Sequence, residues 1–371
     1  MNNLSARHPI WLACVLAVVC GCTTRSQKAD SASPQNANAA VADIQINDPK
    51  PYPFKFVAYG DMRFAEHQSY AGKVIADAKA RQQVIDQIGN EAPAFLVSTG
   101  DFVFRGFHAE DWTYFDRAIK PLRDRGTQIF PAIGNHEVGP FPNLWGPAAL
   151  KGIERLPQRL IASRGLDNYY KEFPNIFHKP WYSVRYANCY FLILDSELAD
   201  GESNAASAQE QAQDQWIRTQ LDSIPPDVDY VFVALHRPPY TALTDAVHKP
   251  RPMQIALSKL VEARQQNSRA HIIVIAGHVH NYERYQHNGV AYIVSGGGGA
   301  APVKFTRAAD DLYPQNPLFG KNDPANEDQY HYCVFTVDHS KLSFQMMKLV
   351  SKANGASFEA RDSFAMDIAG H

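Results

Sequence analysis

Five short polar clusters constrain this chain most, because each stands where an apolar, strand-like run ends. In an open α/β sheet, buried strands read as continuous apolar runs, and ligand sites form beyond their carboxyl ends. A glycine precedes four of the clusters and lets the backbone turn sharply there. The clusters are Gly60-Asp61, Gly100-Asp101, Gly134-Asn135-His136-Glu137, His236-Arg237-Pro238-Pro239-Tyr240 and Gly277-His278-Val279-His280.

These strand ends offer residue types that bind metal ions, because carboxylate oxygens and neutral imidazole nitrogens are common ligands. Each residue taken singly has an ordinary explanation: an aspartate forms a helix N-cap or a turn, and a histidine packs in a core. One shared metal site explains all five positions together. The five strand ends offer these candidates: Asp61, Asp101, Asn135 with His136, His236, and His278 with His280.

The ordered set of clusters resembles the calcineurin-like metallophosphoesterase superfamily, over roughly residues 54–347. The runs after His236 and His278 are similar to the purple acid phosphatase branch: His236-Arg237-Pro238-Pro239-Tyr240 and His278-Val279-His280-Asn281-Tyr282-Glu283-Arg284. The resemblance implies an α/β fold, a four-layer α/β/β/α sandwich of two mixed β-sheets, built by residues 53–371.

The resemblance also implies a centre of two divalent metal ions, manganese, zinc or iron. One ion would take Asp61, Asp101 and His280. The other would take Asp101, Asn135, His236 and His278, so that Asp101 bridges the two. Two ions about 3.5–4 Å apart activate a hydroxide and grip the oxygens of a phosphoryl group.

The implied activity is hydrolysis of phosphate esters, with a small phosphorylated molecule as substrate. His136 would protonate the leaving oxygen, and Arg63, Asn135 and His136 would contact the substrate. Glu137 either orients His136 or is a solvated loop acid. A phosphomonoesterase is the first expectation. The alternatives are a phosphodiesterase or nucleotide hydrolase, and a metal-binding lipoprotein without catalysis.

Two positions depart from the family pattern at the first metal ion. Arg63 stands where many members have histidine, and Phe104 stands where purple acid phosphatases have tyrosine. Water, His67 or His108 would complete the shell, or the position binds metal weakly. Without a tyrosinate ligand, the purple iron colour should be absent. Arg63 either grips a phosphate oxygen or pairs with a local acid such as Glu66.

The N-terminal segment predicts a location outside the cytoplasm. The apolar stretch Ile10 to Val19 is shorter than the roughly 20 residues of a membrane-spanning helix. It resembles a bacterial lipoprotein signal peptide over residues 1–21, with Cys22 as the lipidated residue; an ordinary signal peptide is the alternative. Residues 22–52 are predicted to be a disordered tether. The expected location is the bacterial cell envelope, lipid-anchored and facing the periplasm or outer membrane.

Charge and cysteine content exclude some classes of protein. A net charge of −2 over 371 residues predicts no broad nucleic-acid surface, and the sequence specifies no oligomeric state. Cys189 and Cys333 lie in strand-like runs, as buried thiols or as a disulfide.

The spacing of apolar residues predicts several further elements. Helices are expected at 73–88, 214–224 and 253–264, and hairpins at 182–194 and 330–349. The glycine run 295–299 predicts close backbone packing.

Overall fold

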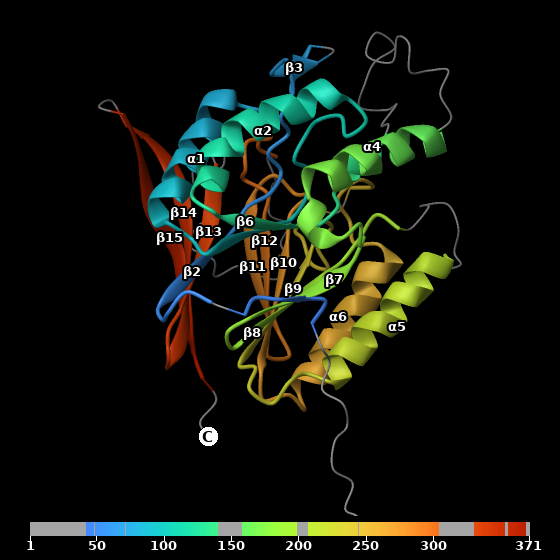
Figure 1. Cartoon of the computed structure of the whole chain (residues 1–371), viewed down its shortest axis with the longest axis vertical. Helices are drawn as coiled ribbons and strands as arrows, with labels where there is room; N and C mark the ends of the chain where they lie inside the picture. The colour runs from blue at the N-terminus through green and yellow to red at the C-terminus, as the bar shows by residue number, and fades with distance from the viewer. Residues whose placement is uncertain are drawn as a thin grey trace, which may run out of the picture. The chain divides into compact units, whose positions relative to one another are not determined.

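The structure is a computed structural model that describes residues 42–47, 49–70, 72–139, 158–198, 207–243, 245–303, 330–352 and 355–368. Within these residues, two mixed β-sheets pack face to face and helices cover both outer faces (Figure 1). This arrangement confirms the predicted α/β/β/α sandwich.

The larger sheet has seven strands in the order β1-β7-β8-β9-β10-β12-β11. Their bounds are β1 Ile44–Gln45, β7 Tyr182–Tyr186, β8 Cys189–Ile193, β9 Tyr230–Leu235, β10 His271–Ala276, β12 Val290–Ser295 and β11 Tyr282–His287. Strands β8, β9, β10 and β12 run parallel, which explains their uninterrupted apolar sequences.

The second sheet has six strands in the order β15-β14-β13-β2-β5-β6. Their bounds are β15 Gly355–Asp367, β14 Lys341–Lys352, β13 His331–Val337, β2 Phe54–Ala58, β5 Phe95–Ser98 and β6 Gln128–Pro131. Strands β2, β5 and β6 are parallel neighbours, so the loops that follow them leave from one edge. A separate small hairpin joins β3 (Ser69–Tyr70) to β4 (Lys73–Val74).

Aromatic side chains join the two sheets in the core. Phe56 on β2 packs edge-on against Phe191 on β8 and Phe232 on β9, with ring centroids 5.1 and 4.9 Å apart. Edge-to-face geometry is a preferred arrangement of aromatic pairs. All three side chains are fully buried, so this contact fixes the distance between the sheets.

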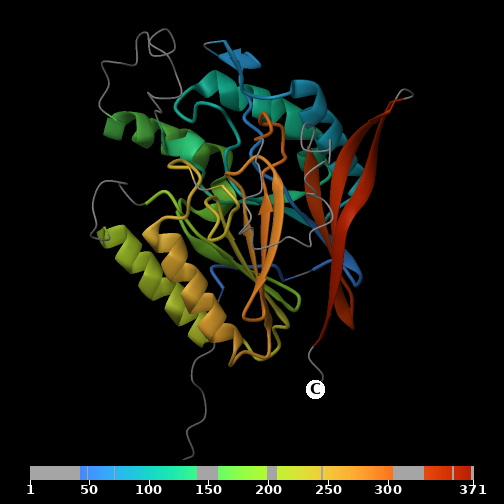
Figure 2. The same cartoon turned by 180° about the vertical axis from the view of Figure 1, so that it is seen from behind.

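Helices cover the outer faces through their apolar sides. Helices α1 (Ala78–Glu91) and α2 (Ala109–Asp124) pack on the six-stranded sheet, and α5 (Ala208–Asp222) and α6 (Pro252–Gln265) pack on the seven-stranded sheet. Figure 2 shows α5 and α6 side by side against that outer face. The remaining helices are α3 (Asn135–Val138), α4 (Gln158–Glu172) and the 3₁₀ turn η1 (Pro174–Ile176).

The predicted helix at 73–88 begins later than its apolar spacing suggested. Asp77 caps α1 by accepting the N–H of Ala80 at 2.9 Å, while Lys73 and Val74 belong to β4. The two predicted hairpins are confirmed as β7–β8 and β13–β14. Cys189 and Cys333 are buried free thiols.

The folded part includes residues that the sequence assigned to the tether. Ile44 and Gln45 form β1 and pair in parallel with Val184 and Arg185. The carboxylate of Asp43 also accepts the N–H of Ser183 at 2.9 Å. The predicted signal peptide and Cys22 lie outside the described residues. Within those residues, no helix combines the length and apolar character needed to cross a membrane.

Candidate metal centre

Three strand ends of one sheet and two of the other bring the predicted ligands together. Asp61, Asp101 and Asn135 follow β2, β5 and β6, whereas His236 and the pair His278 and His280 follow β9 and β10. All six residues are at most 6% exposed. The parallel neighbours on each sheet therefore place carboxylates and an amide opposite imidazoles.

The first position is formed by Asp61, Asp101 and His280, whose ligand atoms lie within 4.8 Å of one another. Nε2 of His280 lies 3.6 Å from Oδ1 of Asp61. Neither of these two buried atoms forms a hydrogen bond within the described part of the chain. Buried polar atoms without partners are costly. A cation at this point would satisfy both.

The second position gathers around Nε2 of His236. This nitrogen lies 2.9 Å from Oδ1 of Asn135, 3.2 Å from Nδ1 of His278 and 3.3 Å from Oδ1 of Asp101. The Asp101 carboxylate therefore faces both positions. The resulting set of two oxygen and two nitrogen ligands is of a kind that divalent ions accept.

Hydrogen bonds on the far side of each ring fix which nitrogen is available. His236 and His280 donate through Nδ1 to the carbonyls of Thr99 and Ala301, at 2.7 and 2.9 Å, so Nε2 keeps its lone pair. Nε2 of His278 lies 3.0 Å from the Val247 carbonyl and 2.7 Å from Nη1 of Arg237, while its Nδ1 faces Nε2 of His236 at 3.2 Å. Lone-pair atoms that face one another at these distances fit a bound cation.

The charges in the site also fit metal ions. Burial is the main cause that lowers the pKa of His236, His278 and His280, so the rings are neutral near pH 7. Burial and then the neighbouring Asp101 charge raise the pKa of Asp61 well above its ordinary value. Two buried carboxylates this close repel each other, and divalent ions relieve that repulsion.

Close backbone approach explains the glycines that precede the ligands. Asp61, Asp101 and His278 all have positive φ, at 58°, 55° and 70°, in the tight turns after their strands. At Gly277, a β-carbon would lie 2.4 Å from Oδ2 of Asp61, which already accepts the N–H of His278 at 2.9 Å. The loops of the two sheets are thus hydrogen-bonded directly.

The glycine run after β12 also packs against the site. A β-carbon at Gly296 would lie 2.0 Å from the Val279 carbonyl, and one at Gly298 would lie 2.0 Å from the Gly60 carbonyl. The predicted close backbone packing of residues 295–299 is confirmed.

Glu137 holds two of the ligand loops together. Its carboxylate accepts the backbone N–H groups of Asp101 at 2.9 Å, Phe102 at 2.9 Å and Gly134 at 2.8 Å. Burial and then the charge of Asp101 raise the pKa of Glu137 to about 8. The residue is 1% exposed, which excludes the solvated loop acid. Its three bonds go to backbone groups, a role that its position in the motif did not reveal.

His136 lies beside the two positions. Its Nδ1 donates to the Phe104 carbonyl at 2.7 Å, and its Nε2 lies 3.8 Å from Oδ2 of Asp101. Burial and then Arg63 lower the pKa of this ring to about 4. The Phe104 ring packs against the His136 ring, with centroids 5.2 Å apart. His136 therefore reaches the shared carboxylate without joining either ligand set.

Arg63 contacts the shared carboxylate, with Nη2 at 3.3 Å from Oδ2 of Asp101, in place of the expected pair with Glu66. The two histidines expected to complete the first position lie in other contacts. His67 is near Glu66 at 3.8 Å with 67% of its side chain exposed, and His108 contacts Glu110 and Asp111. Within the part of the chain that the structure describes, the first position thus has three candidate ligands.

A loop over the second position carries Arg237 and His248, to which the sequence motifs assigned no role. Arg237 is paired with Glu197 at 2.8 Å, and its Nη1 donates to the Val247 carbonyl at 3.1 Å. Nη1 of Arg237 also lies 2.7 Å from Nε2 of His278, so Arg237 connects this loop to a predicted ligand. The His248 ring lies 5.3 Å from the His278 ring, and Asp245 holds its Nδ1 at 2.8 Å. None of the five sequence clusters includes His248.

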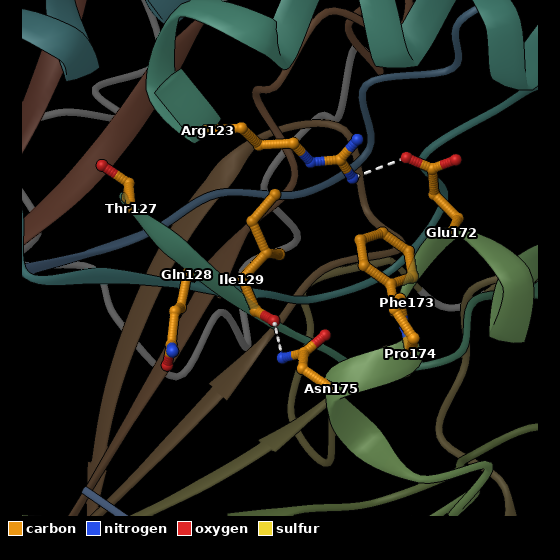
Figure 3. A pocket seen from close by; sticks show the side chains of 8 residues that line it. All are labelled: Arg123, Thr127, Gln128, Ile129, Glu172, Phe173, Pro174 and Asn175. Carbon is orange, nitrogen blue, oxygen red and sulfur yellow. Dashed lines mark hydrogen bonds and ion pairs between the residues drawn. The ribbon is translucent and has the colours of Figure 1, made fainter. Parts of the chain in front are cut away.

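A surface pocket of about 280 Å³ lies elsewhere, between the end of α2, β6 and η1 (Figure 3). Arg123 and Glu172 form an ion pair across it. Its lining includes none of the ligands: Arg123, Thr127, Gln128, Ile129, Glu172, Phe173, Pro174 and Asn175.

Comparisons with known proteins identify the family and the fold. A family model described as calcineurin-like phosphoesterase matches residues 40–282. A protein of Arabidopsis thaliana named "Probable inactive purple acid phosphatase 1" is 26% identical over 327 residues, covering 79% of this chain and 47% of the relative. The chain spans about half the length of that curated relative.

Two solved structures share the fold. Purple acid phosphatase PPD1 from yellow lupin (Lupinus luteus) seeds has a TM-score of 0.59 and 21% identity, over 86% of this chain and 54% of that one. GAP50, "the anchor in the inner membrane complex of Plasmodium", has a TM-score of 0.52 and 14% identity, over 85% and 89%.

Proposed function

Because this chain belongs to the calcineurin-like phosphoesterase family, we propose that it is a metal-dependent phosphoesterase that hydrolyses small phosphate monoesters. One observation carries the proposal: two adjoining sets of buried ligands share Asp101, and His136 lies beside them. Asp61, Asp101 and His280 would hold one divalent ion, and Asp101, Asn135, His236 and His278 the other. Manganese, zinc or iron suits these donors.

The residues around the ligands have distinct roles in the proposed reaction. Bound divalent ions would supply Lewis acidity and lower the pKa of a water molecule. Because Nδ1 of His136 donates to the Phe104 carbonyl and burial keeps the ring neutral, Nε2 carries a lone pair. To act as the general acid, His136 must first bind a proton on Nε2, which a negatively charged phosphate beside it would favour. The guanidinium of Arg63 offers N–H donors to an oxygen of the phosphate. His248, oriented by Asp245, presents its other ring nitrogen beside His278.

A second candidate function is metal binding without catalysis. It is favoured by the three-ligand first position, at which Arg63 and Phe104 stand in place of ligands that the family carries. The Arabidopsis relative is itself named as inactive. Against it stands His136, a residue that a purely metal-binding site would not need.

Metal analysis combined with turnover separates these functions. The purified protein is assayed with p-nitrophenyl phosphate and bis-p-nitrophenyl phosphate after loading with manganese, zinc or iron. Wild-type protein should favour the monoester, and Asp101→Asn should lose both activity and metal, because both ions lose a shared charged ligand. Near wild-type turnover in Asp101→Asn would refute the two-metal assignment. Bound metal without hydrolysis of either ester would support the second function.

The proposal places the reaction outside the cytoplasm, at the cell envelope of a bacterium, with a lipid on Cys22 as anchor. The support is the apolar segment that ends at Cys22 and the polar stretch after it. Cys22→Ser should move the protein from the membrane fraction to the soluble fraction. An unchanged fractionation would reject the lipid anchor and leave the hydrolase assignment intact.

A further inference from the structure

The guanidinium of Arg63 stands at the edge of the first position, against the carboxylate that both positions share. Its Nη2 is 3.3 Å from Oδ2 of Asp101, and its side chain is 14% exposed. Its Nε is buried and forms no hydrogen bond within the described residues. Asp101 is therefore the acidic group that Arg63 contacts in the described structure.

Arg63 and His236 contact different oxygens of Asp101. Nη2 of Arg63 is 3.3 Å from Oδ2, whereas Nε2 of His236 is 3.3 Å from Oδ1. The second position also has a neighbouring guanidinium, since Nη1 of Arg237 is 2.7 Å from Nε2 of His278. Arg237, however, is paired with Glu197 at 2.8 Å, outside both ligand sets, whereas Arg63 is paired with a ligand.

We infer that Arg63 is a built-in cation of the first position, so that the second position binds a divalent ion first and the first position binds one more weakly. The guanidinium neutralises part of the charge of Asp61 and Asp101 when no ion is present. An ion that enters must share Asp101 with it, and two cations repel strongly where water screens them little. The inference deepens the proposed function and rests on it for the identity of the two positions.

Arg63 also gains a role once an ion is bound. Repelled from Asp101, its guanidinium can present a pair of N–H groups to a phosphate oxygen. The same side chain would then move from charge compensation to substrate binding. Binding of an ion at the first position would therefore change which group Arg63 contacts.

Calorimetric titration of the metal-free full chain with Zn²⁺, with bound metal counted by mass spectrometry, tests this order of binding. Wild-type protein should show two events that differ in affinity. Arg63→Gln should tighten the weaker event on the order of tenfold or more, because it removes a nearby positive charge. Arg63→Lys should keep the separation. Arg237→Gln is the matched control, and its effect should be confined to the tighter event.

The outcomes discriminate clearly. Two equal events in wild-type protein, or an unchanged weaker event in Arg63→Gln, would overturn the inference. Circular dichroism adds a second measurement. If Arg63→Gln unfolds only without metal, the inference is supported, because no positive charge then offsets the charges of Asp61 and Asp101. If Arg63→Gln unfolds both with and without metal, the inference is contradicted. Binding is measured without turnover, so sequential binding with no ester hydrolysis would reject the proposed function alone.

Discussion

Replacing Glu137 by glutamine should weaken metal binding although Glu137 belongs to neither ligand set. Its carboxylate accepts three buried backbone N–H groups, those of Asp101, Phe102 and Gly134, at 2.8–2.9 Å. Glutamine keeps one carbonyl oxygen, which can retain the two bonds now made to Oε2. Its amide NH₂ would then face the N–H of Phe102.

The size of the effect follows from those contacts. One bond to a charged acceptor is lost, and one buried N–H is left opposite another donor, so the cost is about 2–5 kcal/mol. This is a large part of the stability of a typical domain. The strain falls on the loops that carry Asp101 and Asn135, so metal affinity should fall together with stability.

A matched control separates the two effects. Glu262 also accepts three hydrogen bonds, from Tyr240, Tyr292 and Asn288 at 2.7–2.8 Å, away from the ligands. Urea unfolding of the metal-free proteins is measured at pH 9, above the pKa of about 8 of Glu137, so that its carboxylate is charged. Zinc affinity is measured at the same pH, in competition with a chelator that keeps free zinc low. Glu262→Gln should lower stability only. Wild-type zinc affinity in Glu137→Gln would refute the reasoning.

Three further predictions concern catalysis, iron and pH. His136→Ala should keep its metal but lose about 10²–10⁴-fold in turnover, with a smaller loss for substrates with good leaving groups; metal loss would make His136 a ligand. Phe104→Tyr should tighten iron binding and give visible colour, and an unchanged spectrum would contradict the placement of Phe104. Burial raises the pKa of Asp195 to about 7, above an unfolded value near 4. That carboxyl contributes stability below pH 4 that is lost as the pH rises to 7, by up to about 4 kcal/mol. Urea unfolding of Asp195→Asn from pH 4 to 8 should lack this decline; equal declines in both proteins would contradict it.

The strand-end clusters let the sequence predict which side chains lie together at one end of the two sheets. A parallel strand buried on both faces needs a continuous apolar run, so the run marks the strand and the first polar residue marks its end. Asp61, Asp101 and His236 were found in this way. The hairpins and the sandwich followed from the same periodicity and from the family resemblance.

Other features of the site depend on contacts that no local pattern records. Glu137 follows His136 in sequence, yet it bonds to backbone groups more than thirty residues away, at Asp101 and Phe102. Glu197 and Arg237 are forty residues apart and meet because β8 and β9 are neighbours. The start of the folded part was placed too late, since two residues, Ile44 and Gln45, are too few to show a strand pattern.

The two sheets contribute different chemistry, and hydrogen bonds join their loops. The six-stranded sheet supplies the carboxylates and the amide, and the seven-stranded sheet supplies the imidazoles. His278 donates its N–H to Asp61, and His236 donates Nδ1–H to the Thr99 carbonyl, so both bonds cross between the sheets. These bonds hold the predicted ligands together without help from an ion. We therefore expect little of an ion's binding energy to be spent on ordering the loops, and differences in affinity between the two positions to reflect their local charges, foremost that of Arg63.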